Sequence, residues 1–493
     1  MKDKKARPLM IVGTMSNAGK SFIAAGLCRI FTEDGYRVAP FKAQNMALNS
    51  FITKKGEEMG RSQVVQAEAC RREPDARMNP VLLKPTTDQG SQVIVMGHPV
   101  GNMNAKEYYR HKNEFLPAVK KAYESLASEN DIIVMEGAGS PAEINLKDQD
   151  IVNMPMAAMA GAPVLLVGNI DPGGVFAQIY GTIKLLDEEE QDLIKGVIIN
   201  KFRGDISILE PGIGMLEGLI EKPVLGVIPY TDIRLEAEDS LALEEHIRKD
   251  KDGSAGLDIA VIRLPKISNF TDFEAFLADP DVRLRYVSHP EELGTPDLII
   301  LPGTKSTIRD LMWLRETGLA DAIRSAHEKG ALLVGICGGY QMLGTAILDP
   351  EGAEMKGEAK GLGYLDMVTV FSKEKTMRQV ETVSDFGIPG IDGRKISGYE
   401  VHMGKAASLS GDPSENAANV LGTYIHGIFD EDEFREAFIT YLYERKGTKR
   451  DPAATAKRLS YRAFRESQID RFAALLREHL DIPAIYKIMG LEK

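Results

Sequence analysis

Short apolar runs alternate with segments of helical spacing along most of this chain. In the first half, the apolar runs lie at residues 9–13, 38–41, 131–135, 163–168, 196–200 and 223–228. This alternation is typical of a parallel sheet that helices cover on both faces. Residues 81–84 and 92–96 instead predict an inserted hairpin.

A second series of apolar runs begins after a polar stretch at residues 235–256, which predicts a helix followed by a linker. Its strands are expected at residues 257–264, 284–287, 298–301, 331–336, 362–371, 395–402 and 420–426. We therefore expect an α/β protein with two parallel-sheet domains, 1–233 and 257–445, joined by a linker at 234–256. Residues 446–493 are expected to form a helical extension, and the charged helical segment 432–480 is expected to pack on the second domain.

Composition narrows the class of protein. A chain of 493 residues is too long for one ordinary core. The net charge of −12 disfavours non-specific nucleic-acid binding, and no apolar stretch has the length of a membrane span. Cys28, Cys70 and Cys337 have neither pairing nor metal-ligand spacing, so we expect a reducing, cytoplasmic environment.

A glycine-containing loop between the first apolar run and a helical segment predicts a phosphate-binding loop for ATP. Backbone N–H groups can cradle phosphates, Lys20 can neutralise their charge, and the Ser21 hydroxyl can ligate Mg²⁺. Five residues separate Gly13 from Gly19, one more than usual, so the alternative is an accidental glycine turn. The expected ATP-binding residues of this loop are Thr14, Asn17, Ala18, Gly19, Lys20 and Ser21.

Two charged residues end neighbouring strands of the predicted first sheet. The Glu136 carboxylate should emerge beside the phosphate loop and ligate Mg²⁺ together with Ser21, although it could instead cap the next turn. Lys42 can offset charge on a phosphoryl group as it moves to a carboxylate, or it can be a solvated lysine.

Cys337 lies in the run Gly-Ile-Cys-Gly-Gly, at the turn from an apolar strand into a helix. Flanking glycines permit a strained turn, and the helix N-terminus favours thiolate, so Cys337 is a candidate nucleophile. The alternative is a buried structural cysteine. His426, at the end of another apolar run, would complete an activated thiol.

The loop after residues 298–301 suggests an oxyanion hole. Backbone N–H groups near Thr304, with that of Gly338, can stabilise a glutaminyl thioester, and Gly303 and Gln341 can contact glutamine. The alternative for this loop is a helix start with a serine or threonine N-cap.

The chain resembles the cobyric acid synthase family. The resemblance rests on the two catalytic motifs and on residues 41–50, 135–140, 171–177, 200–205, 302–307 and 398–404. It implies a dethiobiotin-synthetase-like ATPase domain fused to a class I glutamine amidotransferase domain. It also implies four amidations, at side chains b, d, e and g of adenosylcobyrinic acid a,c-diamide, in cobalamin biosynthesis. Pro172 departs from the family, which usually has arginine there.

The resemblance implies further site residues. Asn200 and Lys201 would contact adenine, and His402 would face an interdomain substrate site. Gln44 and Asn45 are neutral where the cobyrinic acid a,c-diamide synthases have aspartates, which suggests that the corrinoid is positioned differently in this site.

The resemblance also bears on the catalytic histidine. In most class I amidotransferases a glutamate two residues after the histidine completes a triad, but that position is Ile428 here. We therefore expect backbone or water alone to hold His426.

The predicted enzyme would use ATP and Mg²⁺ to make an acyl phosphate on a cobalt-containing corrinoid, with glutamine as nitrogen donor and a passage for ammonia between the domains. The main alternatives are a cobyrinic acid a,c-diamide synthase and a P-loop maturation ATPase whose second domain only binds a partner. A peptidoglycan-precursor amidating ligase is a third alternative. No nucleic-acid or membrane partner is expected.

Overall fold

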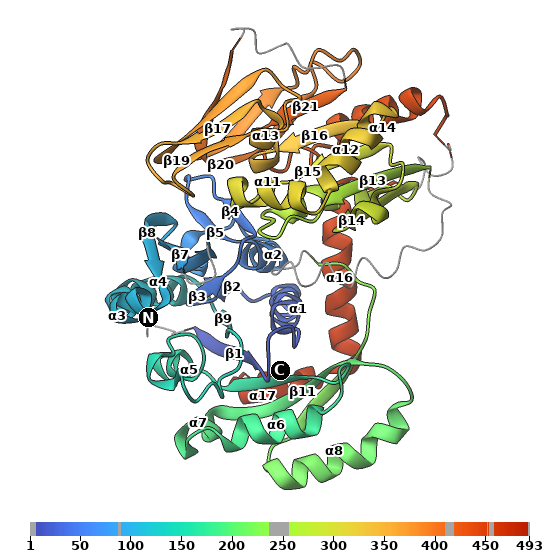
Figure 1. Cartoon of the computed structure of the whole chain (residues 1–493). Helices are drawn as coiled ribbons and strands as arrows, with labels where there is room; N and C mark the ends of the chain where they lie inside the picture. The colour runs from blue at the N-terminus through green and yellow to red at the C-terminus, as the bar shows by residue number, and fades with distance from the viewer. Residues whose placement is uncertain are drawn as a thin grey trace.

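The computed structural model describes residues 6–86, 90–235, 256–409, 419–450, 452 and 458–491. It contains two α/β domains, one above the other in Figure 1, and the long helix α16 runs down beside both. Both predicted parallel-sheet domains are confirmed. Residues 236–255 of the predicted helix and linker lie outside the described residues.

The first domain is built on a parallel sheet. Its strand order is β12-β11-β10-β1-β9-β2. The strands are β1 (Arg7–Gly13), β2 (Val38–Phe41), β9 (Ile132–Glu136), β10 (Val164–Asn169), β11 (Ile194–Phe202) and β12 (Val224–Pro229). The helices and 3₁₀ turns of this domain are α1 (Lys20–Glu33), α2 (Arg61–Ala69), η1 (Ala76–Met78), α3 (Ala105–His111), η2 (Lys112–Phe115), α4 (Leu116–Glu129), η3 (Lys147–Gln149), α5 (Met154–Ala160), α6 (Val175–Lys184), α7 (Glu188–Leu193) and α8 (Ile206–Ile220).

Alternate residues of β1 enter two different cores. Leu9 and Ile11 join the core under α1, whereas Met10 and Val12 join the core under α4, α5, α6 and α8. Both faces of the strand are buried, so the run is apolar throughout instead of alternating with polar residues.

Small sheets extend the first domain toward the second. The predicted hairpin is confirmed as β6 (Val81–Pro85) with β7 (Gly90–Val95), which pair antiparallel. They lie in a sheet of order β3-β6-β7-β8, with β3 (Gln44–Met46) and β8 (His98–Asn104). The separate hairpin β4 (Ser50–Ile52) with β5 (Glu58–Gly60) reaches the second domain (Figure 1).

The second domain has a parallel sheet of order β14-β13-β15-β16-β21 and a mixed sheet of order β18-β17-β19-β20. The parallel strands are β13 (Leu257–Ile262), β14 (Val282–Val287), β15 (Leu298–Leu301), β16 (Leu332–Ile336) and β21 (Val420–Thr423). The mixed sheet contains β17 (Ala346–Asp349), β18 (Gly357–Lys360), β19 (Met367–Val383) and β20 (Lys395–Ser408). Its helices include η5 (Phe270–Ala278), α10 (Pro290–Leu293), α11 (Thr307–Glu316), α12 (Leu319–Glu328), α13 (Gly338–Leu343) and α14 (Asp432–Lys446).

The C-terminal helices divide between the two domains, which corrects the expectation that residues 432–480 pack on the second domain. Phe434 and Phe438 of α14 do join the second core. In contrast, α16 (Tyr461–His479) and α17 (Ile482–Ile488) bury Phe472, Leu476 and Ile485 in the first-domain core under α1. The apolar spacing in α16 identifies an amphipathic helix, but it does not say which domain the apolar face meets.

Within the described residues, no helix combines the length and the apolar character that crossing a membrane requires.

Candidate functional site

The glycine-containing loop joins β1 to α1 at the carboxyl edge of the first sheet. Gly19 adopts a left-handed conformation with φ 101° at the start of α1. The Lys20 ammonium donates to the carbonyl oxygens of Met15 and Gly139, both at 3.1 Å. The ammonium therefore lies over the mouth of the loop, where a bound phosphate would meet it.

Glu136 is the centre of a buried polar cluster at the end of β9. Its Oε1 accepts hydrogen bonds from Ser21 Oγ at 2.7 Å and from Lys42 Nζ at 2.9 Å. Its Oε2 accepts from Gln66 Nε2 at 2.6 Å and from Gln63 Nε2 at 3.4 Å. The structure thus brings together Ser21, Glu136 and Lys42 from three separate segments, and sequence reasoning missed the two glutamines of α2.

The oxygens of Ser21 and Glu136 fit one side of a Mg²⁺ site. Magnesium commonly takes one or two protein oxygens and completes its shell with phosphates and water. No group of three or more histidine, cysteine or acidic residues suited to a metal occurs in the described part of the chain. A cation here would accordingly depend on nucleotide phosphates for its remaining ligands.

A cavity of about 900 Å³ opens beside this cluster. Its lining includes, among the predicted residues, Asn17, Gly19, Lys20, Ser21, Lys42, Gln44, Asn45, Asn200 and Lys201. Thr14 and Ala18 are not part of this lining, and the Thr14 hydroxyl instead donates to Gln178 Oε1 at 3.2 Å. Most of the predicted ATP and substrate residues therefore share one cavity.

Asn200 has a second contact that the sequence did not predict. Its Nδ2 donates to the Ala18 carbonyl at 2.9 Å, and a Cβ on Gly19 would come within 2.0 Å of that nitrogen. The amide therefore supports the phosphate loop from β11, in the cavity wall where adenine contact was expected.

Cys337 sits on a strained turn between β16 and α13. Its backbone has φ 52° and ψ −108°, in the left-handed half of the map that side chains rarely adopt. Only glycine fits at position 339, two residues after the cysteine, since a Cβ there would lie 2.0 Å from the Leu301 carbonyl oxygen. The turn presents the thiol at the helix N-terminus, and Sγ lies 3.6 Å from the Val401 carbonyl oxygen.

His426 is held by a carboxylate, which corrects the expectation of backbone or water alone. Its Nδ1 lies 2.6 Å from Asp272 Oδ2, and the Gly427 N–H donates to Asp272 Oδ1 at 3.1 Å. Asp272 belongs to η5, 154 positions before the histidine, so no local motif marks it. The one available signal is an acidic residue inside the aromatic stretch Phe270 to Phe276.

The environment of His426 favours imidazolium. Burial lowers its pKa, but the Asp272 carboxylate and hydrogen bonding to Cys337 outweigh burial and raise the pKa from 6.5 to about 10. At neutral pH the ring is therefore protonated beside the thiol. Cys337, His426 and Asp272 together have the geometry of an activated thiol nucleophile.

The predicted oxyanion and glutamine residues lie next to members of this triad. A Cβ on Gly338 would lie 3.1 Å from the Thr304 nitrogen, and a Cβ on Gly303 would lie 3.0 Å from His426 Cε1. The Gln341 N–H donates to the Cys337 carbonyl oxygen at 3.0 Å, and its side-chain oxygen accepts from Thr307 Oγ1 at 3.3 Å. Each of the four predicted residues therefore contacts Cys337, His426 or a residue directly beside them.

His402 lies with the thiol site instead of the cavity of the first domain. Its ring stacks on Tyr424 with centroids 4.0 Å apart, and its Nδ1 lies 2.9 Å from the Gly404 carbonyl oxygen. It does not line the cavity that contains Lys42, Gln44 and Asn45.

Buried charges join the domains near these sites. Glu58 of the first domain accepts from Lys84 Nζ at 2.9 Å and from Lys375 Nζ of the second domain at 2.5 Å. Gln92 Oε1 accepts from Lys375 at 3.0 Å and from Lys305 at 3.2 Å. Burial and the two neighbouring lysines lower the pKa of Lys305 to about 7.

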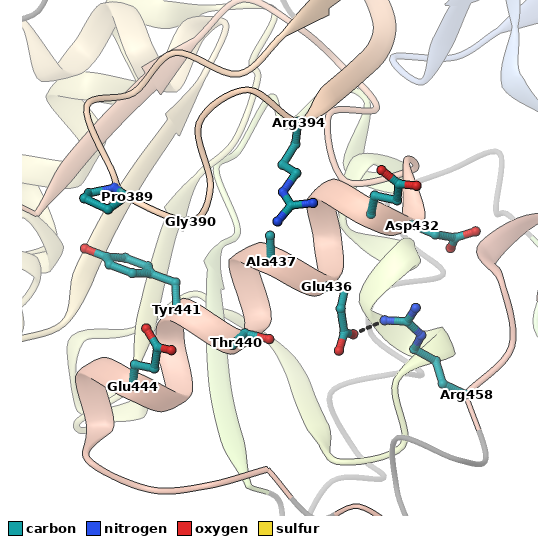
Figure 2. A pocket seen from close by; sticks show the side chains of 11 residues that line it. Pro389, Gly390, Arg394, Asp432, Glu436, Ala437, Thr440, Tyr441, Glu444 and Arg458 are labelled. Atoms are coloured by element: carbon teal, nitrogen blue, oxygen red, sulfur yellow. Dashed lines mark hydrogen bonds and ion pairs between the residues drawn. The ribbon is translucent and has the colours of Figure 1, made fainter.

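A second cavity has a volume of about 590 Å³ and shares no lining residue with the cavity of the first domain. Figure 2 shows the side chains that line it. Its lining comes from α14, the loop before β20 and Arg458, which pairs with Glu436. It contains none of the predicted catalytic or ATP-binding residues.

Comparison with known proteins matches both halves of the chain. The family model of the CobQ/CobB/MinD/ParA nucleotide binding domain matches residues 9–242. The family model of the CobB/CobQ-like glutamine amidotransferase domain matches residues 258–434. The cobyric acid synthase of Ruminiclostridium cellulolyticum is 53% identical to this chain, over 99% of this chain and 98% of its own length. The cobyric acid synthase of Photorhabdus laumondii is 52% identical, over 98% of each chain.

Proposed function

Because this chain belongs to the cobyric acid synthase family, we propose that it amidates side chains b, d, e and g of adenosylcobyrinic acid a,c-diamide, a cobalt-containing corrinoid, to give adenosylcobyric acid. Family membership establishes the broader activity, which is ATP- and glutamine-dependent amidation of corrin side chains in cobalamin biosynthesis. The observation that carries the proposal is the pairing of a thiol triad in one domain with a phosphate-loop cavity in the other.

Glutamine is hydrolysed at Cys337. The thiolate attacks the side-chain amide carbon and forms a tetrahedral intermediate, whose oxyanion the N–H groups around Thr304 and Gly338 stabilise. His426 donates its proton to the departing ammonia, which leaves a glutaminyl thioester. Water then attacks the thioester, His426 takes the water's proton, and glutamate is released. Asp272 keeps the imidazole oriented through both steps.

The carboxylate of the corrinoid is activated in the cavity of the first domain. The corrin carboxylate oxygen attacks the γ-phosphorus of ATP and forms an acyl phosphate, with ADP as leaving group. Lys20 and Lys42 offset the charge on the transferring group. Ser21 and Glu136 would hold Mg²⁺, which supplies further charge neutralisation at the phosphates. Ammonia then displaces phosphate to give the amide.

Ammonia must reach the acyl phosphate without becoming ammonium in bulk water. We place this route along the β4–β5 hairpin, which contacts both sites. Ser50 of the hairpin bonds Tyr399 in the second domain, and a Cβ on Gly60 would lie 2.5 Å from Asn45 in the cavity wall.

Two alternatives are disfavoured. A cobyrinic acid a,c-diamide synthase is expected to carry aspartates where Gln44 and Asn45 line this cavity. A maturation ATPase with a non-catalytic second domain has no use for a buried thiol beside a carboxylate-held histidine. We also propose a cytoplasmic location, the reducing compartment in which such a thiol stays reduced.

The decisive experiment is mass spectrometry of adenosylcobyrinic acid a,c-diamide incubated with the enzyme, ATP, Mg²⁺ and glutamine. Four successive losses of about one mass unit are expected, since each step replaces a hydroxyl by an amino group. Unchanged substrate, or amidation of cobyrinic acid at a and c instead, would contradict the proposal.

The division of labour predicts that Cys337→Ala loses glutamine-dependent amidation but keeps amidation supported by ammonium salts, because the thiol serves only to release ammonia. The same mass assay measures both rates. Loss of both activities in a folded variant would contradict separate sites.

A further inference from the structure

Ser50 of the first domain contacts two residues of the second domain, one of which stacks on His426. The Ser50 N–H donates to Asn269 Oδ1 at 3.2 Å, and the Ser50 carbonyl accepts from the Tyr399 hydroxyl at 2.9 Å. Asn269 Nδ2 donates to the same tyrosine oxygen at 3.2 Å. We call Ser50, Asn269 and Tyr399 the interdomain clamp, and all three are at least 97% buried.

Tyr399 of the clamp contacts His426 through both its ring and its main chain. Its ring lies nearly parallel to the imidazole, with centroids 5.3 Å apart and planes inclined by 21°. Main-chain hydrogen bonds run in both directions, from Tyr399 N to the His426 carbonyl at 3.1 Å and from His426 N to the Tyr399 carbonyl at 2.8 Å. The position of this ring therefore limits the tilt of the imidazole.

The asparagine of the clamp fixes the segment that carries Asp272. Asn269 precedes η5 in a left-handed conformation, with φ 52° and ψ 40°, and its carbonyl accepts from the Asp272 N–H at 3.1 Å. Asp272 in turn holds His426 Nδ1. Ser50 therefore contacts the stacking Tyr399 directly and is linked to Asp272 through Asn269.

The residue before Ser50 connects the clamp to the helix beside the ATP cavity. The Asn49 carbonyl accepts from the Arg61 N–H at 3.1 Å, and Arg61 begins α2. Gln63 and Gln66 of the same helix hold the carboxylate of Glu136. A continuous set of bonded segments therefore joins the expected metal ligand to the catalytic histidine.

We propose that Asn269 and Tyr399 are positioning residues, through which the docked first domain holds His426 in the orientation that glutamine hydrolysis requires. The inference rests on the proposed function, because it takes His426 as the acid and base of the glutaminase. Glutamine hydrolysis is then fast only while Ser50 is seated in the clamp. Small displacements of a catalytic group cost large factors in rate, so the clamp acts on turnover more than on glutamine binding.

Two variants test the clamp without removing the histidine or its carboxylate. Tyr399→Phe keeps the stacked ring but removes the hydroxyl that bonds Ser50 and Asn269. Asn269→Gly removes the amide but keeps the left-handed backbone, which glycine adopts freely. The matched control is Thr271→Val, because the Thr271 hydroxyl donates to Asn49 Oδ1 at 3.3 Å across the same interface and, among the described hydrogen bonds, does not join Tyr399 or His426.

The measurements are kcat and KM for glutamine hydrolysis, and the rate of amidation with ammonium salts. For both clamp variants we expect kcat to fall about tenfold or more, from the misplacement of the ring. KM for glutamine should stay within about twofold, and ammonia-dependent amidation should stay at the parent rate. Thr271→Val should hydrolyse glutamine at nearly the parent rate.

The inference fails if the clamp variants turn over glutamine like the parent. It also fails if Thr271→Val loses as much kcat as they do, or if ammonia-dependent amidation falls in parallel, since either result indicates general damage to the interface. A parent enzyme that hydrolyses no glutamine would overturn the proposed function itself, and the inference with it.

Discussion

Asp272 gives the catalytic histidine its orientation and its charge. The carboxylate accepts from imidazole Nδ1, which leaves the other ring nitrogen for the thiol, and it keeps the ring protonated at neutral pH. These two effects can be separated by exchanging the carboxylate for an amide of the same shape.

We predict that Asp272→Asn lowers kcat for glutamine hydrolysis about a hundredfold or more, because the imidazole loses the partner that fixes its tautomer. Removing the negative charge also lowers the pKa of His426 from about 10. The alkaline limb of the pH–rate profile should therefore move to lower pH. Stopped-flow assays between pH 6 and roughly 10.5 would cover that limb.

The matched control is Asp258→Asn, in the same domain, where the carboxylate pairs with Arg285 instead of the histidine. It should leave the pH–rate profile in place. An Asp272→Asn variant with the parent profile would remove the carboxylate from the mechanism.

Glu136 and Lys20 lie in the other domain and should show the opposite dependence on the nitrogen source. Glu136→Ala and Lys20→Ala remove, respectively, the expected metal ligand and the charge at the phosphate loop. Each should slow amidation about a hundredfold or more whether glutamine or ammonia is supplied. Isothermal titration of each variant with ATP and Mg²⁺ should show weaker nucleotide binding. If Glu136→Ala amidates normally with ammonia, Glu136 is only a structural cap of the next turn.

Single residues could be predicted where their chemistry is local. Lys20, Ser21 and Cys337 lie in turns that their own neighbours define, so a short motif identifies them. Asp272 could not be predicted in this way, since its role depends on where η5 meets the end of β21. Nothing between residues 272 and 426 encodes that contact in a local pattern.

At the scale of elements, the inner strands of both parallel sheets were predictable because burial on two faces makes their runs apolar throughout. The docking of α16 was not, because an amphipathic helix of this kind fits either core. What selects the partner is close approach: a Cβ on Gly26 of α1 would come within 2.4 Å of Leu476 Cδ1 and within 3.0 Å of Phe472 Cδ1.

We predict that Gly26→Ala lowers the melting temperature, because the added methyl group overpacks the contact between α1 and α16. Overpacking costs about 1–3 kcal/mol, which outweighs the gain in helix propensity of about 1 kcal/mol. Gly218→Ala in α8 is the matched control, since among the described residues no atom beyond the backbone of its own helix lies within 4 Å of the added Cβ. That variant should be slightly stabilised, and calorimetry would compare the two; equal shifts would contradict a tight α1–α16 contact.

At the scale of the whole molecule, the β4–β5 hairpin and α16 are two of the connections between the domains, and they differ in character. The hairpin contact is polar and contains the buried Glu58, whose pKa burial raises but Lys375 and Lys84 together hold well below its usual range. The contact of α16 is mainly apolar, with a bond from Arg29 to Glu466 at 2.6 Å.

The return of α16 and α17 to the first domain means that this domain is assembled from two segments of the chain that lie on either side of the second domain. A break in the coding sequence between codons 236 and 255 would leave a first fragment whose α1 surface, including Leu27 and Phe31, lacks its cover. The second fragment would contain α16 and α17, whose apolar residues would then have no first-domain core to pack against. Each fragment would then act as the folding partner of the other, so we expect co-expressed halves to reconstitute one enzyme while either half alone aggregates.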